Sequence, residues 1–205
     1  CSHTCVLPWP LRSILPLNEG WNDTEQLDKF TDHSHSARNA HMQIQLLPTS
    51  AEQLPLLANL YQFYAYESSD WEQEDVETDG RFYIHQPHLQ RYWQEPGWSA
   101  QLILVDDFIA GFLLIEQSEL PGLDVPEFAD LFILKKYRRQ GIGRALVQQV
   151  MGDGRPWLLR FYRQDELACA FWQQLLNEWP RPARPVWTEE EADGLLTYLI
   201  NPPVH

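Results

Sequence analysis

Apolar residues alternate with polar ones in several short segments of the chain, and this two-residue period predicts β-strands. The first segment is 42–47, where Ile44 and Leu46 lie on one side of a half-buried strand. Further strands are expected at 101–105, 108–115, 129–134, 157–162, 186–187 and 195–200. Asp106 and Asp107 separate the second and third of these strands, and they predict a hairpin turn.

Three other segments space their apolar residues as amphipathic helices do. The first stripe consists of Leu54, Leu57, Tyr61 and Tyr64. Ser50 and Gln53 precede it with the spacing of a capping box. The second stripe consists of Ile142, Ala145, Leu146 and Val150, and Gly152-Asp153-Gly154 ends it. The third helix is expected at 165–176. These elements suit one α/β (α+β) domain.

Residues 1–41 differ from the rest of the chain, because they are rich first in prolines and then in polar residues. We expect them to form a poorly ordered N-terminal arm, with the folded domain spanning 42–205. The motif Cys1-Ser2-His3-Thr4-Cys5 offers metal-binding side chains at its start. No second ligand pair follows at a recognised spacing, so no metal site is expected.

The charge balance of the chain is strongly acidic, with 29 Asp and Glu against 15 Lys and Arg and a formal net charge of -14. Nucleic acid requires an extended basic surface, so this balance argues against nucleic acid as the main partner. Three cysteines do not make a disulfide framework. No apolar run approaches the ~18 residues that span a bilayer. The composition therefore favours a cytoplasmic protein without a membrane segment.

Five of the 15 cations nevertheless fall within the ten residues 135–144, which we call the basic loop. The loop contains Gly141 and Gly143 and lies between a predicted strand and a predicted helix. Unpaired amides at a helix start, the helix dipole and glycines without a Cβ together favour an anion. A phosphate group is the expected ligand. Charge-assisted hydrogen bonds can be added by the side chains of Arg138, Arg139 and Arg144.

Two common phosphate motifs do not fit the basic loop. A dinucleotide-binding fingerprint needs a third glycine where this chain has Leu146. A P-loop needs Lys and then Ser or Thr after its second glycine, where this chain has Arg144 and Ala145. What remains is Arg-x-x-Gly-x-Gly, formed by Arg138, Gly141 and Gly143 after a strand that ends Leu-Phe-Ile-Leu.

The segment from Asp130 to Leu146 resembles motif A of the GCN5-related N-acetyltransferase (GNAT) superfamily. A second similarity follows downstream, where the family often has Asn-x-x-Ala-x-x-Phe-Tyr and this chain has Asp165-x-x-Ala168-x-x-Phe171-Trp172. The order of predicted elements from Met42 to Pro202 also matches the family. The resemblance implies a mixed, largely antiparallel central sheet, flanked by helices and splayed between its fourth and fifth strands.

The resemblance also implies acetyl-CoA as the acetyl donor. Its pyrophosphate would be held by the amides of Arg139, Gln140, Gly141, Ile142, Gly143 and Arg144. The strand Leu131-Phe132-Ile133 would lie along the pantetheine arm, which would pair with the backbone of Leu131 and Ile133 as an added strand. An amide of this strand would face the thioester carbonyl, where negative charge develops.

The helix after the fifth strand departs from the family pattern. Trp172 stands where many members have a tyrosine that protonates the departing thiolate, and an indole cannot be a general acid. Either transfer proceeds without an acid, because a thiol is a tolerable leaving group, or another tyrosine replaces it. The candidates are Tyr64, Tyr66 and Tyr162. Asp165 replaces an asparagine and is expected to bond backbone near the cofactor.

The acceptor of the acetyl group would be a small-molecule or peptide amine. A base must take the proton of the attacking amine, and Asp130 and Glu116 are the candidates. Seven carboxylates lie between Glu67 and Gly80, where they either attract a cationic amine or form a solvated acidic loop. The alternative function is a catalytically silent acyl-CoA-binding module, which Trp172 keeps open. A homodimer also remains open.

Overall fold

The computed structural model describes residues 42–188 and 194–203 of the chain. The expected N-terminal arm, with the cysteine motif at its start, lies outside these described residues. The first described element is strand β1, Ile44–Pro48, which corresponds to the strand expected at 42–47.

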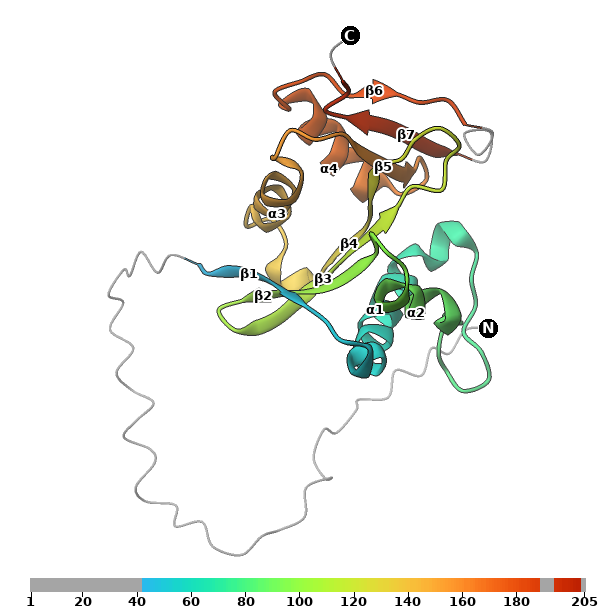
Figure 1. The fold of residues 1–205 in the computed structure, drawn as a ribbon. Coiled ribbons are helices and arrows are strands. Elements are labelled where there is room, and N and C mark those ends of the chain that lie inside the picture. The colour runs from blue at the N-terminus through green and yellow to red at the C-terminus, as the bar shows by residue number, and fades with distance from the viewer. Residues whose placement is uncertain (1–41, 189–193, 204–205) are drawn as a thin grey trace, which may run out of the picture. The chain divides into compact units, whose positions relative to one another are not determined.

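Seven strands form one sheet in the order β1-β2-β3-β4-β5-β7-β6 (Figure 1). After β1 they are β2 Ser99–Val105, β3 Phe108–Gln117, β4 Pro126–Ile133, β5 Trp157–Tyr162, β6 Arg184–Pro185 and β7 Leu195–Ile200. Neighbouring strands are antiparallel except β4 and β5, which are parallel, and this confirms the expected mixed sheet. The hairpin between β2 and β3 is also confirmed, because Asp106 and Asp107 have φ of 48° and 67°, as a two-residue turn requires.

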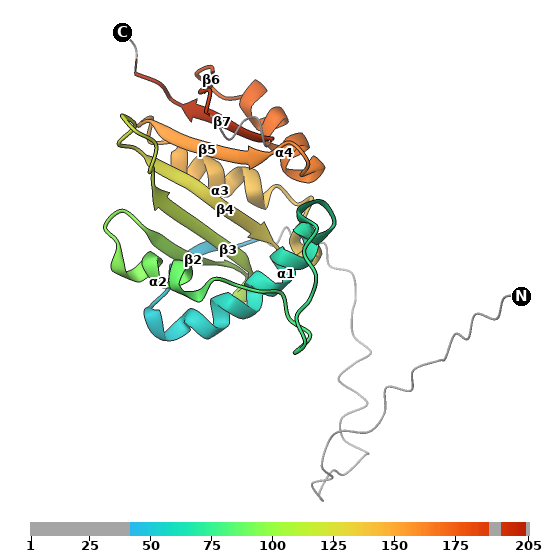
Figure 2. The ribbon, with the colours of Figure 1, turned by 90° about the vertical axis from the view of Figure 1, so that its right-hand side faces the viewer.

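Helices cover both faces of this sheet (Figure 2). On one face lie α1, Leu54–Glu72, and α2, Gln86–Gln94. On the other lie α3, Ile142–Met151, and α4, Glu166–Asn177. A short 3-10 turn, η2 Ala51–Gln53, leads into α1, and Gln53 Oε1 accepts the Ser50 amide at 3.0 Å, as expected for a capping box. A second turn, η3 Lys135–Tyr137, follows β4.

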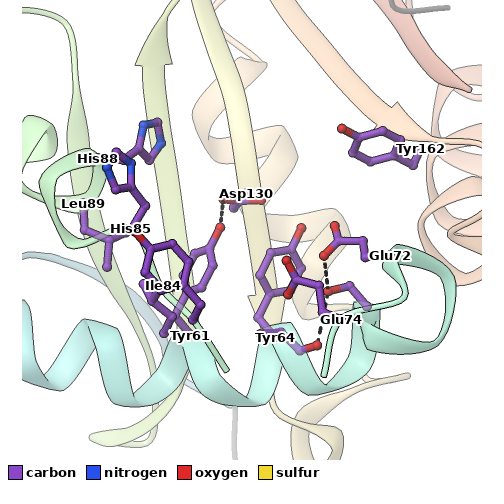
Figure 3. A pocket seen from close by; sticks show the side chains of 13 residues that line it. Tyr61, Tyr64, Glu72, Glu74, Ile84, His85, His88, Leu89, Asp130 and Tyr162 are labelled. Atoms are coloured by element: carbon purple, nitrogen blue, oxygen red, sulfur yellow. Dashed lines mark hydrogen bonds between the residues drawn. The ribbon is translucent and has the colours of Figure 1, made fainter. Parts of the chain in front are cut away.

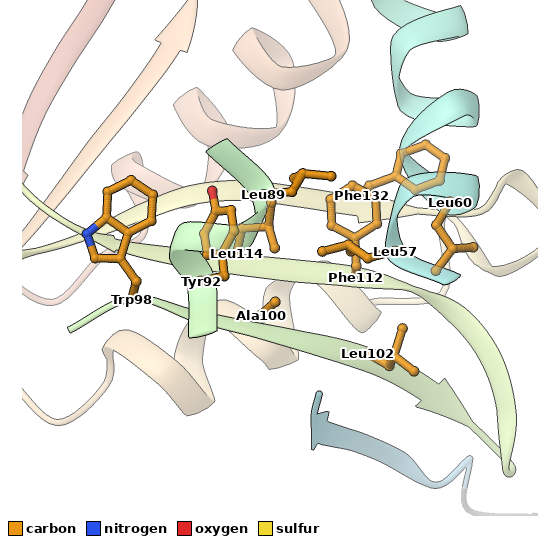
Figure 4. Close-up of a cluster of buried hydrophobic side chains, with 10 residues drawn as sticks. All are labelled: Leu57, Leu60, Leu89, Tyr92, Trp98, Ala100, Leu102, Phe112, Leu114 and Phe132. Carbon is orange, nitrogen blue, oxygen red and sulfur yellow. The ribbon is translucent and has the colours of Figure 1, made fainter. Parts of the chain in front are cut away.

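The sheet face under α1 and α2 carries a densely packed core (Figure 4). Its buried members are Leu57, Leu60, Leu89, Tyr92, Trp98, Ala100, Leu102, Phe112, Leu114 and Phe132. Residues two apart on a strand face the same side, so Leu113, between two of these residues, points to the opposite face. There it packs with Val147 of α3, Leu159 of β5 and Trp172 of α4. Because both faces are covered, β3 is buried continuously from residue 110 to residue 114.

Strands β4 and β5 are paired only near their starts. Glu127 pairs with Leu158 and Phe128 with Leu159, whereas residues 129–133 of β4 have no partner on β5. The two strands therefore separate toward their carboxyl ends, as Figure 2 shows. This confirms the expected splay between the fourth and fifth strands.

Two elements differ from the expectation. The apolar pattern did not reveal α2, because only Leu89 and Tyr92 of this helix are buried, and two positions do not establish a period. The strand expected at 186–187 was wrong, since β6 is Arg184–Pro185. A two-residue strand has no period that fixes its position. The Val186 amide still donates to the Thr197 carbonyl at 2.9 Å.

Candidate active site

A cavity of about 360 Å³ opens on the α1 side of the sheet, and we call it the α1–β4 cavity (Figure 3). Asp130 lines it from β4 and Tyr162 from β5, so the cavity lies over the splay between these strands. The other lining residues are Tyr61, Tyr64, Ala65, Ser68, Glu72, Glu74, Tyr83, Ile84, His85, His88 and Leu89. Most of them are tyrosines, histidines or carboxylates.

A β-bulge places Asp130 in this cavity. Asp130 pairs with Leu114 of β3, but Phe128 pairs with the next residue, Ile115, so Ala129 is an extra residue in the ladder. An extra residue reverses the alternation of side chains beyond it. Phe128 accordingly belongs to the core under α3 and α4, whereas Asp130 faces the α1 side.

The carboxylate of Asp130 is held by α1. Tyr61 Oη donates to Asp130 Oδ2 at 3.1 Å. Burial raises the pKa of Asp130, and the charge of Glu116 adds to this rise, while the hydroxyls of Tyr64 and Tyr61 oppose it. A raised pKa brings a carboxylate closer to the range in which it can accept and release a proton at neutral pH. The structure thus places this base candidate in the cavity.

The described lining of the cavity pairs its carboxylates with no Lys or Arg, and its cationic contribution comes from His88, whose charge opposes the rise in the pKa of Asp130. Glu72, Glu74 and Asp130 are acidic, and none of the described residues that line the cavity is Lys or Arg. Burial raises the pKa of Glu72, and the charges of Glu74 and Asp130 add to the rise. The Ser68 hydroxyl, which donates to Glu72 Oε2 at 3.0 Å, opposes it. Carboxylates that repel one another in this way favour a cationic ligand.

The other base candidate, Glu116, does not line the cavity. Glu116 lies beside the lining residue His88, with Oε1 3.4 Å from His88 Nε2. The same carboxylate accepts a hydrogen bond from the Tyr92 hydroxyl. The hydrogen bond with Glu116 raises the pKa of His88, although burial opposes the rise. The sequence reasoning missed His88. Its position four residues before Tyr92 is a usable signal only once α2 is known to be a helix.

The three tyrosines considered as acids lie in different places. Tyr64 and Tyr162 line the cavity, and Tyr162 is also in contact with Trp71, at 5.1 Å between ring centroids. The charge of Asp130, followed by burial, raises the pKa of Tyr64. Tyr66 is 65% exposed and is not among the cavity residues, so it lies apart from the other two.

The basic loop presents a run of unbonded amides. Within the described residues, no backbone carbonyl accepts a hydrogen bond from the amides of residues 139–144, and the first amide bonded again is that of Ala145, to the Gly141 carbonyl at 3.0 Å. Arg139 and Gly141 have φ of 63° and 80°, and Gly141 is the N-cap of α3. A Cβ on Gly141 would meet no atom within 4 Å, so this side of the loop is open. The geometry fits a pyrophosphate held by main-chain amides.

The arginine side chains of the basic loop do not all face an open site. Arg138 donates to Glu67 of α1 at 2.6 Å, and Arg144 is paired with Glu178. Among the described residues no partner is found for Arg139. Of the three guanidinium groups expected around the phosphate, two are therefore paired with carboxylates of the protein, and whether any of them contacts the anion stays a prediction.

Helix α4 packs closely against the start of α3. A Cβ on Gly143 would lie 3.2 Å from the Phe171 ring, which explains a glycine at this position. Asp165 is the N-cap of α4 and accepts the Ala168 amide at 2.8 Å. Its expected bond to backbone is thus made to its own helix.

Trp172 lies in the core under α3 and α4 and is not among the cavity residues. It is only 6% exposed, and its ring makes edge contacts with Phe128 and Phe171 at centroid distances of 5.5 and 5.0 Å. Phe128 is the last β4 residue that pairs with β5. Trp172 therefore packs where the splay begins.

None of the helices in residues 42–188 and 194–203 combines the length and apolar character needed to cross a bilayer. The same residues contain no group of three or more His, Cys, Asp or Glu side chains that could hold a metal ion.

Several solved structures share this fold. An acetyltransferase from Thermus thermophilus has a TM-score of 0.56 and 19% identity, covering 77% of this chain and 96% of that one. The PaiA N-acetyltransferase from Thermoplasma acidophilum, in complex with coenzyme A, has a TM-score of 0.53 and 14% identity, covering 77% and 98%. The histone acetyltransferase HPA2 and related acetyltransferase from Corynebacterium glutamicum has a TM-score of 0.53 and 12% identity, covering 80% and 98%.

No curated protein sequence matches the chain. The model of the acetyltransferase (GNAT) family matches residues 57–177, which is more than half of the 205 residues. This match includes most of α1, the splayed strand β4, the basic loop and α4. The chain therefore belongs to the GNAT family of acetyltransferases, whose acetyl donor is acetyl-CoA.

Proposed function

We propose that this enzyme transfers an acetyl group from acetyl-CoA to a primary amine of a cationic small molecule or peptide. The observation that carries the proposal is the α1–β4 cavity. It holds Glu72, Glu74 and Asp130 without a Lys or Arg among its described lining residues, and it lies over the splay of β4 and β5. An amine bound there would be next to the edge of β4.

The donor would be held mainly by the main chain. The unbonded amides of residues 139–144 would bind the pyrophosphate. Residues 129–133 of β4 lack a strand partner on the β5 side, and such an edge can pair with an extended ligand such as the pantetheine arm. Leu131 and Ile133 would contribute their backbone. The side chain of Phe132 is committed to the core under α1.

The acceptor would be recognised through charge and aromatic surface. Moving an ammonium group out of water is costly unless carboxylates compensate it, and Asp130 and Glu72 are placed to do so. Tyr61, Tyr64 and Tyr162 can add contacts between a cation and a ring face. Together these features favour an amine with further positive charge over a neutral or acidic molecule.

Asp130 would accept the proton that the amine loses. An ammonium ion has no free electron pair, so it must be deprotonated before nitrogen can bond to the acetyl carbon. Burial raises the pKa of Asp130, which makes its carboxylate a stronger base, and Tyr61 holds that carboxylate at 3.1 Å. The thiolate of coenzyme A would then depart with the electron pair of the C–S bond that breaks. Of the tyrosines considered as its proton donor, Tyr162 lines the cavity from β5, the strand on the far side of the splay.

Release of free thiol from acetyl-CoA, measured with a panel of amines, tests the proposal. The panel contains an α,ω-diamine, a monoamine of equal length, an amino acid and a lysine peptide. We expect kcat/KM to be at least about tenfold higher for the diamine than for the monoamine, since a second charge close to carboxylates contributes roughly 1–2 kcal/mol. Preference for an acidic acceptor would contradict it. Binding of acetyl-CoA without turnover of any amine would favour the silent module.

A second test concerns the position at which many family members have a tyrosine. Trp172→Phe keeps an aromatic ring against Phe128 but removes the indole N–H together with part of the ring volume. Since Trp172 lies in the core and outside the cavity, we expect kcat to fall less than ~10-fold, whereas loss of a general acid costs ~10²–10⁴-fold. Thermal melting serves as the control for a cavity left by the smaller ring. A thousandfold loss of kcat in a folded variant with normal acetyl-CoA affinity would show that the indole takes part directly.

A further inference from the structure

Arg138 is the first residue of Arg-x-x-Gly-x-Gly, yet its guanidinium group already makes hydrogen bonds to other residues of the protein. Nε donates to the Ile133 carbonyl at 2.5 Å, and Nη2 donates to Glu67 Oε2 at 2.6 Å. The guanidinium carbon also lies 5.6 Å from the centroid of the Phe132 ring. Arg138 therefore connects the end of β4, the basic loop and helix α1.

The contact between Arg138 and Glu67 is partly shielded from water. The two side chains are 25% and 23% exposed, respectively. Lys135, the first residue of the basic loop, also places Nζ 4.0 Å from Glu67 Oε1, so one carboxylate faces two cations of the loop. A shielded, hydrogen-bonded pair of this kind is stronger than an exposed surface ion pair.

The main chain of the loop has few hydrogen bonds of its own, among them those from Gln140 Nε2 to the Lys136 carbonyl at 3.0 Å and from the Arg138 amide to the Lys135 carbonyl at 3.3 Å. The amides of residues 139–144 are bonded to no carbonyl in the described chain, and Arg139 has a φ of 63°, which is uncommon for a residue with a side chain. Contacts with residues outside the loop therefore add to the few within it in holding the shape that exposes these amides. The contacts of Arg138 with Glu67 and with Ile133 immediately precede this segment.

We propose that Glu67 and Arg138 are positioning residues of the donor site, which hold the basic loop in its anion-binding shape without binding the phosphates themselves. A site that is ordered before the ligand arrives saves the cost of ordering it on binding. Glu67 lies on α1, the helix that lines the α1–β4 cavity, but its main effect is thus on the affinity for acetyl-CoA.

The proposal predicts the sign of a charge effect. Coenzyme A is an anion, so electrostatics alone predicts tighter binding when a nearby carboxylate is neutralised. Release of Arg138 from Glu67 would also tighten binding if the freed guanidinium could bind a phosphate. If the pair instead holds the loop in shape, Glu67→Gln must weaken binding.

The test is calorimetric titration of the full chain with coenzyme A. We expect Glu67→Gln to raise the Kd by about tenfold, the scale of a lost preorganising contact. Asp70→Asn is the matched control, because it removes an α1 carboxylate for which no ion pair is found among the described residues, and it should leave Kd unchanged. In turnover assays Glu67→Gln should raise the KM for acetyl-CoA while kcat at saturation stays within about twofold.

A second variant separates geometry from charge. Arg138→Lys keeps the cation but cannot donate to Ile133 and Glu67 with the geometry of a guanidinium, so it should weaken coenzyme A binding as Glu67→Gln does. If Glu67→Gln fails to fold, Arg138→Lys decides alone. Wild-type or tighter binding in a folded Glu67→Gln protein, or in folded Arg138→Lys, would overturn the proposal. Because binding is measured without an acceptor, this outcome is independent of whether an amine is acetylated.

Discussion

Replacement of Asp130 by Asn is expected to lower kcat by at least about 100-fold, the lower end of what a general base contributes. Asparagine has nearly the same size and can still accept the Tyr61 hydroxyl, but it cannot take up the proton of the amine. Affinity for coenzyme A should remain near that of the wild type, since Asp130 lies in the α1–β4 cavity and not in the basic loop. Thiol release measures kcat, and calorimetric titration measures the affinity for coenzyme A.

Glu116→Gln is the matched control for this experiment, because Glu116 is the other base candidate and does not line the cavity. We expect its kcat to remain within about fivefold of the wild type, well below the loss of a base. A large loss in Glu116→Gln together with a small loss in Asp130→Asn would show that the base was assigned to the wrong carboxylate.

The same Asp130→Asn substitution should stabilise the folded protein at neutral pH. Burial raises the pKa of Asp130 above its ordinary 3.8, so the native state binds more protons than the unfolded state as the pH rises from 3.8 to the raised value. Stability therefore falls through this window in the wild type, and the variant lacks that loss. Thermal melting as a function of pH should show that the melting temperature of Asp130→Asn exceeds that of the wild type by a difference that grows as the pH rises and then becomes constant. A lower melting temperature for Asp130→Asn at neutral pH would contradict this account.

Gly141→Val is expected to abolish the rise in melting temperature that acetyl-CoA produces in the wild type. Gly141 has a φ of 80°, and its Cβ position is open. The amides beside it donate no hydrogen bond to a carbonyl of the described chain. A branched side chain there would occupy space that the pyrophosphate needs and would disfavour the loop conformation. The readout is the melting temperature with and without acetyl-CoA.

Gly122→Val is the matched control for backbone strain. Gly122 has a φ of 78°, and its Cβ position is equally free of atoms within 4 Å, but it lies in the turn between β3 and β4. Both variants should lose similar stability without ligand, and only Gly122→Val should keep the shift with acetyl-CoA. An undiminished shift in Gly141→Val would mean that the donor phosphates bind elsewhere.

The donor side of the site could be predicted because its signals are contiguous. An apolar strand, Gly141 and Gly143, and a helical stripe that follow one another directly predict a strand, a loop and a helix start, and β4, η3 and α3 have this arrangement. What a loop does with its backbone depends mainly on its own residues. The same reasoning could not show that Arg138 and Arg144 are paired, because their partners are Glu67 and Glu178, 71 and 34 residues away.

The proposed acceptor side, the α1–β4 cavity, could be predicted only in part. Tyr61, His88, Asp130 and Tyr162 come from four elements that no local pattern brings together. Motif A makes Asp130 a candidate base, but its side of the sheet depends on a bulge in the ladder with β3, and the sequence shows no sign of that bulge. Pairing between distant segments decides such positions.

The short pairing of β4 with β5 leaves the sheet in two parts, β1 to β4 and β5 to β7, that few backbone pairs join. Seven residue pairs join β3 to β4 and six join β5 to β7, but only two join β4 to β5. With so few pairs, amides at this seam are expected to exchange hydrogen more easily than those in the ladders beside it, and Phe128 packs on Trp172 where the pairing ends. A pantetheine arm lying along β4 would close this seam from within, so that amide protection on both sides rises together. The sheet would then be stiffer while the donor is bound and would loosen again with each release of coenzyme A.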